Sequence, residues 1–338
     1  MGTAEEVGSA PFVSTGSLPD PERVQHLLHD AHGRYLPDTG GTVSQVYPAL
    51  AAVDPALFGL AVVSSAGRVY SAGDALTPFA IMSVVKPFTF AMLCEDVGVA
   101  QARRLVGVNA TGLPFNSLAA VERAGGGRTN PMVNAGAIAT VAALSGGPVE
   151  QRWTRIEQAM ARFAGRTLTV DSEIYASASA TSQRNRALAQ LLSSLGSFST
   201  DPAEAVDLYT RACCLSVTAQ DLAAMGAVLA DGGVHPLTRE RVVGVESCRA
   251  VLAVMTTSGL YETSGDWLYE IGLPGKSGIG GGIVTVSPGK GALATYSPPL
   301  DDAGNSVRGQ RASAHLSRSL GLDLFISAPM NEPGQGSS

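Results

Sequence analysis

The order in which the hydrophobic patterns change along this chain is the strongest constraint on its fold. Residues 58–64 and 67–71 predict two strands joined by a tight turn, and residues 278–286 and 291–296 show the same alternation late in the chain. Helical patterns dominate between about 100 and 230, and the clearest ones cover 150–163, 184–195 and 219–229. Further helices are predicted over 21–32, with Asp20 as N-cap, and over 309–320. Strands, helices and strands again predict an α/β core interrupted by an all-helical insertion.

Length and composition predict a globular protein. With 338 residues, of which 45% are hydrophobic and 15% charged, the chain can bury a large core. We expect disordered tails at 1–20 and 329–338 and a single domain over 21–328, with an α/β core at about 21–100 and 235–328 and a helical subdomain at about 101–234.

The charge and the cysteines indicate the class of partner and the compartment. A net charge of −6 without a basic cluster argues against nucleic acid and against an anionic membrane surface, which leaves small-molecule chemistry. Cys94, Cys213, Cys214 and Cys248 lack C-x-x-C spacing, so we interpret them as reduced core thiols. The first residues contain neither a basic nor an apolar signal region, and we expect a cytoplasmic protein.

A serine and a lysine lie one helical turn apart in Ser83-Val-Val-Lys86, directly after an apolar run. If a helix begins close to Ser83, positions i and i+3 share a face and the lysine can act as base for the serine hydroxyl. Pro87 supports a helix start there, because proline is tolerated in a first turn. The pattern alone is also compatible with an ordinary helix start.

A second motif raises the prospect of acyl transfer. Lys276-Ser277-Gly278 precedes a predicted strand, as the K-T-G motif does in penicillin-binding proteins and class A β-lactamases. Serine–lysine acyl-transfer enzymes need a nucleophile, an amine base, a second proton carrier and an oxyanion N–H, and this chain offers candidates for all four.

Several longer segments together resemble one family, the serine-dependent glutaminases, over about residues 24–326. They include Gly112-Leu-Pro-Phe-Asn-Ser117, Asn130-Pro-Met-Val-Asn-Ala-Gly-Ala-Ile138, Arg184-Asn185-x-Ala187 and Gly272-Leu-Pro-Gly-Lys-Ser-Gly-Ile-Gly-Gly-Gly282. The resemblance implies a β-lactamase/DD-peptidase-like α/β fold, with a central, mostly antiparallel sheet flanked by helices and an all-helical subdomain. It also implies hydrolysis of L-glutamine to L-glutamate and ammonia by a serine-dependent amidase.

The resemblance further implies a role for particular residues. Ser83 would be the nucleophile and Lys86 the general base, with an oxyanion hole from the backbone N–H groups of Ser83 and Ile279. The residues implied in substrate binding or beside the nucleophile are Asn134, Asn185, Tyr209, Tyr261 and Ile279, and Lys276 is a further candidate. Each has an ordinary alternative: the asparagines as caps, the tyrosines as core aromatics and Lys276 as an ion-pair partner.

One family position that contacts substrate is changed here. In glutaminases the segment before Arg184-Asn185 reads Tyr-x-Ser-Glu, and the glutamate contacts the amino-acid end of glutamine; here the glutamate is replaced by Ala178. Glu173 could substitute only after a backbone shift. Loss of a charged contact to the substrate ammonium costs about 2–5 kcal/mol, so we expect poor turnover of glutamine.

A second family position, a tyrosine in Gly-x-Val-Ala-x-Tyr-Ile-Pro, is also changed. With Gly41 and Pro48 aligned, Val46 takes the place of that tyrosine, and Tyr47 follows it. Neighbouring residues of an extended chain point in opposite directions, so we expect Tyr47 to face away from the site unless this loop rearranges.

Three functions remain open from the sequence. The first is a glutaminase with an acyl-enzyme on Ser83, and the second is an amidase or acyltransferase for an amide that lacks a free α-amino group, with Ala178 making room. The third is a catalytically weak relative that only binds ligand. The serine–lysine mechanism needs no metal and no organic cofactor, and the resemblance implies a homodimer or homotetramer.

Overall fold

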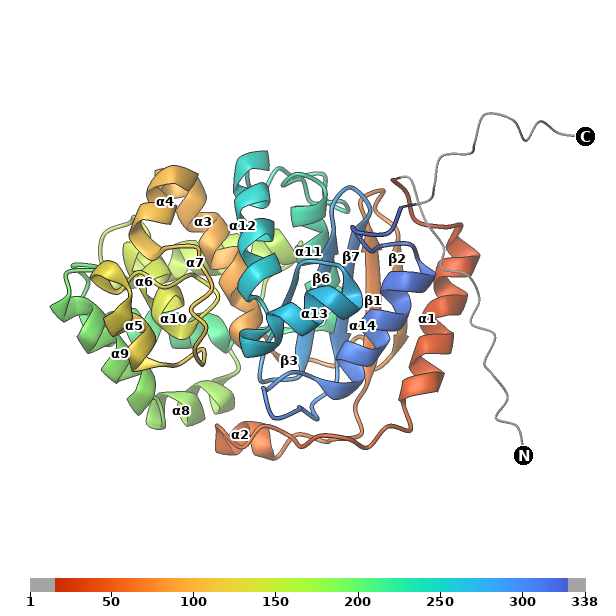
Figure 1. Cartoon of the computed structure of the whole chain (residues 1–338), viewed down its shortest axis with the longest axis horizontal. Coiled ribbons are helices and arrows are strands. Elements are labelled where there is room, and N and C mark those ends of the chain that lie inside the picture. The colour runs from red at the N-terminus through yellow and green to blue at the C-terminus, as the bar shows by residue number, and fades with distance from the viewer. Residues whose placement is uncertain (1–15, 328–338) are drawn as a thin grey trace, which may run out of the picture.

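Strands from both ends of the chain meet in one five-stranded sheet (Figure 1). The strand order is β2-β1-β7-β6-β5, and every neighbouring pair is antiparallel. The strands are β1 (Gly59–Ser64), β2 (Val69–Gly73), β5 (Gly275–Ser277), β6 (Gly282–Ser287) and β7 (Gly291–Tyr296). The structure is a computed structural model that describes residues 16–327. The predicted tails at 1–20 and 329–338 lie outside these residues, apart from 16–20.

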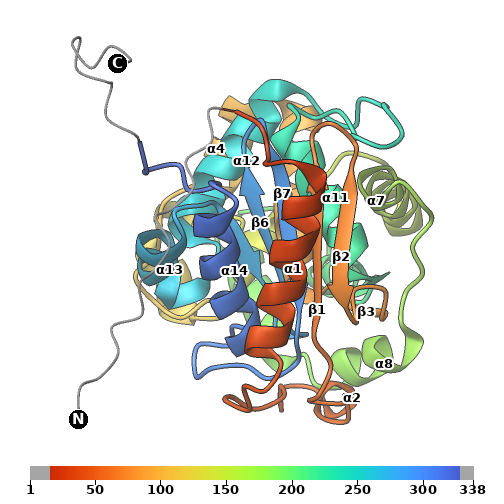
Figure 2. The same ribbon diagram turned by 90° about the vertical axis from the view of Figure 1, so that its right-hand side faces the viewer.

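Helices cover both faces of the sheet, which explains why its central strands are apolar throughout. Leu60 and Val62 of β1 pack toward one face and Ala61 and Val63 toward the other, and all four are buried. Figure 2 shows α1 and α14 side by side over the first face, and α11 packs against the second. The bounds are α1 (Pro21–Tyr35), α14 (Val307–Ser319) and α11 (Ala219–Ala230).

Close packing of α11 on the sheet depends on one glycine. A Cβ added at Gly226 would lie 2.6 Å from Val284 Cγ2 and 2.7 Å from Ala292 Cβ, closer than real Cβ contacts allow. A larger residue would therefore push the helix off β6 and β7.

The helical part of the molecule is built around α3 (Lys86–Val97) and α6 (Asn134–Ala143), which are buried on nearly all sides. Shorter or amphipathic helices surround them, and these are α4 (Val99–Val106), α5 (Leu118–Arg123), α7 (Val149–Ala164), α8 (Ser172–Ala180), α9 (Gln183–Ser194) and α10 (Pro202–Cys213). The remaining helices are α2 (Pro48–Ala51), α12 (Val245–Ser258) and α13 (Ser264–Ile271). None of the helices within 16–327 is both long and apolar enough to cross a bilayer.

A two-stranded ribbon connects the sheet to the helical part. Its strands are β3 (Phe79–Ala80) and β4 (Ser216–Val217). Directly after β3 the chain forms the 3₁₀ turn η1 (Met82–Val85), which continues into α3. The residues between sheet and helices are therefore held at both ends by regular structure.

Most elements expected from sequence periodicity are confirmed. The first hairpin, the helix capped by Asp20 and the helices at 150–163, 184–195, 219–229 and 309–320 each correspond to an observed element within two or three residues at either end. All four cysteines are free and buried, as expected. The division into a core and a helical subdomain stays a prediction.

The late strand region differs from the expectation. We predicted one strand over 278–286, but residues 278–281 form a turn, and β6 begins at Gly282. Lys276 and Ser277 precede this strand, as predicted, but they also form part of the short edge strand β5, which was not predicted. Three residues flanked by glycine and proline are too few to show a period of two.

Candidate active site

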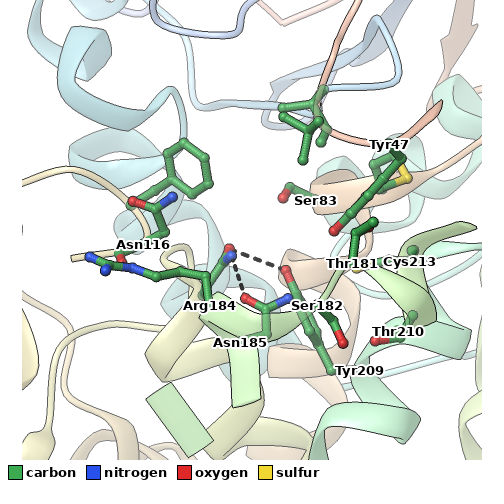
Figure 3. A pocket seen from close by; sticks show the side chains of 16 residues that line it. Tyr47, Ser83, Asn116, Thr181, Ser182, Arg184, Asn185, Tyr209, Thr210 and Cys213 are labelled. Carbon is green, nitrogen blue, oxygen red and sulfur yellow. Dashed lines mark hydrogen bonds between the residues drawn. The ribbon is translucent and has the colours of Figure 1, made fainter. Parts of the chain in front are cut away.

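A cavity of about 120 Å³ lies where η1 and the β5–β6 turn face the helical part of the molecule. Figure 3 shows Ser83 above Asn185 and Tyr209, with Tyr47 and Thr181 beside it. The residues that line the cavity are Val46, Tyr47, Met82, Ser83, Phe115, Asn116, Asn134, Ala178, Thr181, Ser182, Arg184, Asn185, Tyr209, Thr210, Cys213 and Ile279. Seven segments of the sequence thus supply one site.

Ser83 sits at the second position of η1, just before the turn of helix that contains Lys86. The preceding residue, Met82, has φ of +49°, a conformation that non-glycine residues rarely adopt. Such backbone strain persists only where surrounding packing imposes it, and it is common beside functional residues. The expected helix start close to Ser83 is confirmed, with a 3₁₀ turn as its first part.

Lys86 is completely buried, and its amine donates two hydrogen bonds. Nζ lies 2.8 Å from Asn134 Oδ1 and 3.1 Å from the carbonyl oxygen of Met132. No carboxylate pairs with it in the described part of the chain, and burial lowers the pKa of Lys86 to about 7. A lysine with this pKa is neutral in a substantial fraction of molecules near neutral pH, and the neutral amine can accept a proton.

An amide and phenol network extends from Lys86 to the far side of the cavity. Asn134 Nδ2 donates to Asn185 Oδ1 at 2.9 Å, and the Tyr209 hydroxyl donates to Asn134 Oδ1 at 3.3 Å (Figure 3). Asn134 is the first residue of α6 but does not cap it through its side chain, so the alternative interpretation as a cap is wrong. The network holds three polar side chains in fixed orientations.

Tyr261 and Lys276 lie on the other side of the nucleophile. The Tyr261 hydroxyl donates to the carbonyl oxygen of Ser277 at 3.4 Å, and burial raises the pKa of Tyr261 to about 12, while the nearby Ser83 hydroxyl acts to lower it. Lys276 Nζ is 4.4 Å from the centre of the Tyr261 ring and donates to the carbonyl oxygens of Gly259 and Ser277. Burial, followed by the charge of Lys86, holds the pKa of Lys276 well below its usual range.

The contacts of Lys276 decide whether it is an ion-pair partner, which was the alternative left open by the sequence. Lys276 has carbonyl partners and no ion pair within residues 16–327, so the interpretation as an ion-pair partner is wrong. Tyr261 is buried and has φ of +56°, and it lines a second hollow that shares Phe115 with the cavity.

Ser83 and Ile279 both line the cavity, and their backbone N–H groups have no hydrogen-bond acceptor among the described residues. Gly278 brings the two segments together, because a Cβ at this position would be 3.2 Å from Ser83 N and 3.1 Å from Val84 Cγ2. The close approach of the β5–β6 turn to η1 therefore needs a residue without a side chain.

Tyr47 does not face away from the site, and this prediction is wrong. Its side chain lines the cavity and its hydroxyl points toward the space beside Ser83 (Figure 3). The alternation rule fails because the segment is not a strand: Tyr47 is the N-cap of α2, where the chain turns, and Pro48 begins the helix. Val46 also borders the cavity, but it is 55% exposed at the rim.

Ala178 forms part of the cavity wall, as the sequence comparison predicts for this position. It lies on the buried face of α8 together with Ile174, while Glu173 is exposed on the first turn. Glu173 and Ala178 are five positions apart, which is about 140° around a helix, so the carboxylate of Glu173 points elsewhere. The wall at Ala178 is therefore apolar.

Sequence reasoning missed several lining residues, including Asn116, Thr181, Ser182 and Cys213. We expected Cys213 to be a core thiol; it is buried, but it also borders the cavity, and burial raises its pKa to about 11. Cys213 lies four residues after Tyr209 on α10, and positions with this spacing share a helix face. The spacing could therefore have indicated that Cys213 lies beside Tyr209 at the site.

Comparison with known proteins yields glutaminases consistently. The family model described as glutaminase matches residues 41–325. Glutaminase 2 of Yersinia pestis is 58% identical over 96% of both chains, and a glutaminase of Colwellia psychrerythraea is 47% identical over 89% of this chain and 97% of its own. The solved structure of the probable glutaminase ybaS superposes with a TM-score of 0.90 at 43% identity, covering 91% of this chain and all of that one.

Proposed function

This chain belongs to the glutaminase family and is an amidohydrolase that converts L-glutamine to L-glutamate and ammonia, and we propose that it does so through an acyl-enzyme on Ser83. Its fold is the β-lactamase-like fold of the solved glutaminases, as predicted. The observation that carries the proposal is the position of Ser83 in the cavity, one helical turn before a buried lysine whose pKa is lowered to about 7.

In the first half of the reaction, Ser83 Oγ attacks the carbon of the γ-carboxamide. Neutral Lys86 takes the proton of the hydroxyl, which lets the oxygen form the new C–O bond. The C–N bond then breaks, and the nitrogen leaves as ammonia after it receives a proton. A water molecule subsequently hydrolyses the ester, which releases the carboxylate product and returns the proton to Ser83.

The negative charge that develops on the carbonyl oxygen needs donors that are already in place. We assign this role to the backbone N–H groups of Ser83 and Ile279, which have no other acceptor among the described residues. Fixed donors in a buried cleft stabilise an oxyanion more than water does, because they need not reorganise.

Proton transfer to the leaving nitrogen requires a group beside the nucleophile. Tyr261 is one candidate, because its hydroxyl interacts with Ser83 and the amine of Lys276 lies over its ring. Tyr47 is the second candidate, since its hydroxyl points toward the same space (Figure 3). This position of Tyr47 supports the proposal that Tyr47 takes over the role of the family tyrosine, which is replaced by Val46 in this chain.

The polar ends of the substrate would bind on the helical side of the cavity. Asn134, Asn185 and Tyr209 form a connected network there, Ile279 also lines the cavity, and Tyr261 packs behind it against Phe115. Because the network orients its amide and hydroxyl groups before substrate arrives, binding does not have to order them.

The test is ammonia release from L-glutamine combined with trapping of the acyl-enzyme. In the presence of hydroxylamine, an ester on Ser83 gives γ-glutamyl hydroxamate, and we expect both products to disappear in Ser83→Ala. Ser194→Ala, at an exposed position of α9, is the matched control and should retain both. Ammonia release that persists in Ser83→Ala, or a ligand-induced rise in melting temperature without any turnover, would refute the proposal.

Assembly and location are also proposals. We propose a homodimer or homotetramer, which light scattering on the purified protein would distinguish from a monomer. A cytoplasmic location agrees with four free, buried cysteines, which a reducing compartment maintains. Cell fractionation tests this location.

A further inference from the structure

The cavity has an unusual charge balance for a protein that handles amino acids. Among its lining residues no side chain carries a carboxylate, and Arg184 is the single member with a permanent charge. Two further amines, those of Lys86 and Lys276, are buried directly behind the lining. A zwitterionic amino acid would therefore find positive groups for its carboxylate but no negative group for its ammonium.

The acidic side chains on neighbouring elements do not supply the missing charge. Asp171 caps α8 by accepting the N–H groups of Glu173 and Ile174, and Glu173 itself is exposed on the opposite side of that helix. Asp207 of α10 is bound by the Tyr175 hydroxyl and by Arg211. Each carboxylate is thus engaged or turned away from the cavity.

Two of the uncharged hydrogen-bond acceptors in the cavity already accept hydrogen bonds from other protein groups. Asn134 Oδ1 already accepts hydrogen bonds from Lys86 and Tyr209, and Asn185 Oδ1 accepts one from Asn134. An ammonium group placed here would lose its water and regain little, and an unpaired charge in a partly buried site is costly.

The wall that would face the α-nitrogen is uncharged and adjoins the solvent. We call Val46, Ala178, Thr181 and Ser182 the α8 side of the cavity, because they lie on α8, just after it, or on the loop packed against it. Helix α2, which directly follows that loop, contacts α8, since Ala49 N donates to Ser177 Oγ at 3.3 Å. Two methyl-bearing side chains and two hydroxyls can accommodate a small acyl group, and the exposed rim at Val46 leaves room for a longer one.

From these observations we propose that the enzyme prefers γ-carboxamides whose α-nitrogen is acylated or absent over free L-glutamine. The inference rests on the proposed acyl-enzyme mechanism and names its substrate class. The bond broken is the same C–N bond of the side-chain carboxamide: water replaces ammonia at the carboxamide carbon, and the α-N-acyl group remains attached. The products are ammonia and an N-acylated glutamate.

The first experiment compares kcat/KM of the unmodified enzyme for three amides at pH 7.5. These are L-glutamine, Nα-acetyl-L-glutamine and glutaramic acid, which has the same chain without an α-nitrogen. We expect both amides without an ammonium group to exceed L-glutamine by roughly tenfold or more, the lower end of what an unpaired buried charge costs. A higher kcat/KM for L-glutamine than for both would overturn the inference.

The second experiment restores a carboxylate on the α8 side. Ala178→Glu should raise kcat/KM for L-glutamine and lower it for Nα-acetyl-L-glutamine, whereas Ala178→Gln, which has the same size without the charge, should lower both. Equal effects of the two variants on L-glutamine would contradict the charge argument. The comparison within the unmodified enzyme remains decisive if Ala178→Glu does not fold.

The outcomes separate this inference from the mechanism beneath it. Ser83-dependent turnover with L-glutamine as the best substrate refutes the substrate preference and leaves the mechanism intact. Absence of ammonia and of hydroxamate from all three amides refutes the mechanism and, with it, the preference.

Discussion

The two sides of the cavity differ in how completely their polar groups are paired. On the nucleophile side, by which we mean Ser83, Lys86, Tyr261 and Lys276, both amines and the Tyr261 hydroxyl have protein partners and all four side chains are buried. On the α8 side, Ala178 and Val46 offer only carbon atoms, and Val46 is 55% exposed. The segments that match the family motifs build the first side, and both departures from those motifs fall on the second.

This difference separates two properties of an enzyme. Groups on the nucleophile side act on the bond that breaks, so changing them should affect every amide to a similar degree. Groups on the α8 side meet the part of the substrate that does not react, so changing them should alter the ranking of amides. The predictions below examine this separation.

The largest effect is expected for Lys86→Met. Without a base for the Ser83 hydroxyl, kcat should fall by on the order of 10²–10⁴-fold for L-glutamine and for Nα-acetyl-L-glutamine alike. In the unmodified enzyme, kcat/KM should rise as pH increases through about 7, because Lys86 then loses its proton. Steady-state kinetics between pH 5.5 and 9 measures both effects, and a loss confined to one amide would contradict the separation.

The buried amine also makes stability depend on pH. Lys86 has a pKa of about 7 in the folded protein and 10.5 as its ordinary value, so between these pH values the unfolded chain binds a proton that the folded chain lacks. The free energy of unfolding should therefore increase with pH across this window, and Lys86 should add no pH dependence below it, where both states carry the proton. Urea unfolding at pH 7 and pH 10 should show a smaller rise for Lys86→Met than for the unmodified protein.

Asn185→Ala should act mainly through binding. It removes an amide from the network around Asn134 and leaves Asn134 Nδ2 without its acceptor, a loss worth about 1–3 kcal/mol. We expect KM for both amides to rise roughly tenfold or more, with a smaller change in kcat. Gln190→Ala, on the exposed face of the same helix, is the control. A fall in kcat at constant KM would contradict this prediction and would show that Asn185 acts on the chemical step and not on binding.

Tyr47→Phe gives the smallest expected effect and the sharpest test of the comparison, because Tyr47 lies beside the α8 side but points toward Ser83 (Figure 3). If its hydroxyl carries protons, kcat should fall about tenfold or more for all amides, toward the lower end of acid–base effects. Tyr269→Phe on α13, where the side chain is 88% exposed, should change nothing. An unchanged kcat would assign proton transfer to Tyr261.

Local patterns in the sequence were sufficient for much of the fold. The hairpin of β1 and β2, the N-cap of α1 and the limits of β7 follow from spacing and turn residues that lie close together in the chain. Strand β5 could not be predicted this way, because three residues show no period and its pairing partner is supplied by tertiary structure.

The same division holds within the site. The three-residue spacing of Ser83 and Lys86, the glycine at 278 and the alanine at 178 were determined by the sequence alone, because each depends on which side chain occupies a position. Tertiary structure decided that Tyr47 enters the cavity, that Lys86 has a pKa of about 7 and that no carboxylate lines the wall beside Ala178. A turn redirects Tyr47, and burial sets the pKa. The charge balance depends on which distant segments pack together, and none of these three properties has a local signal.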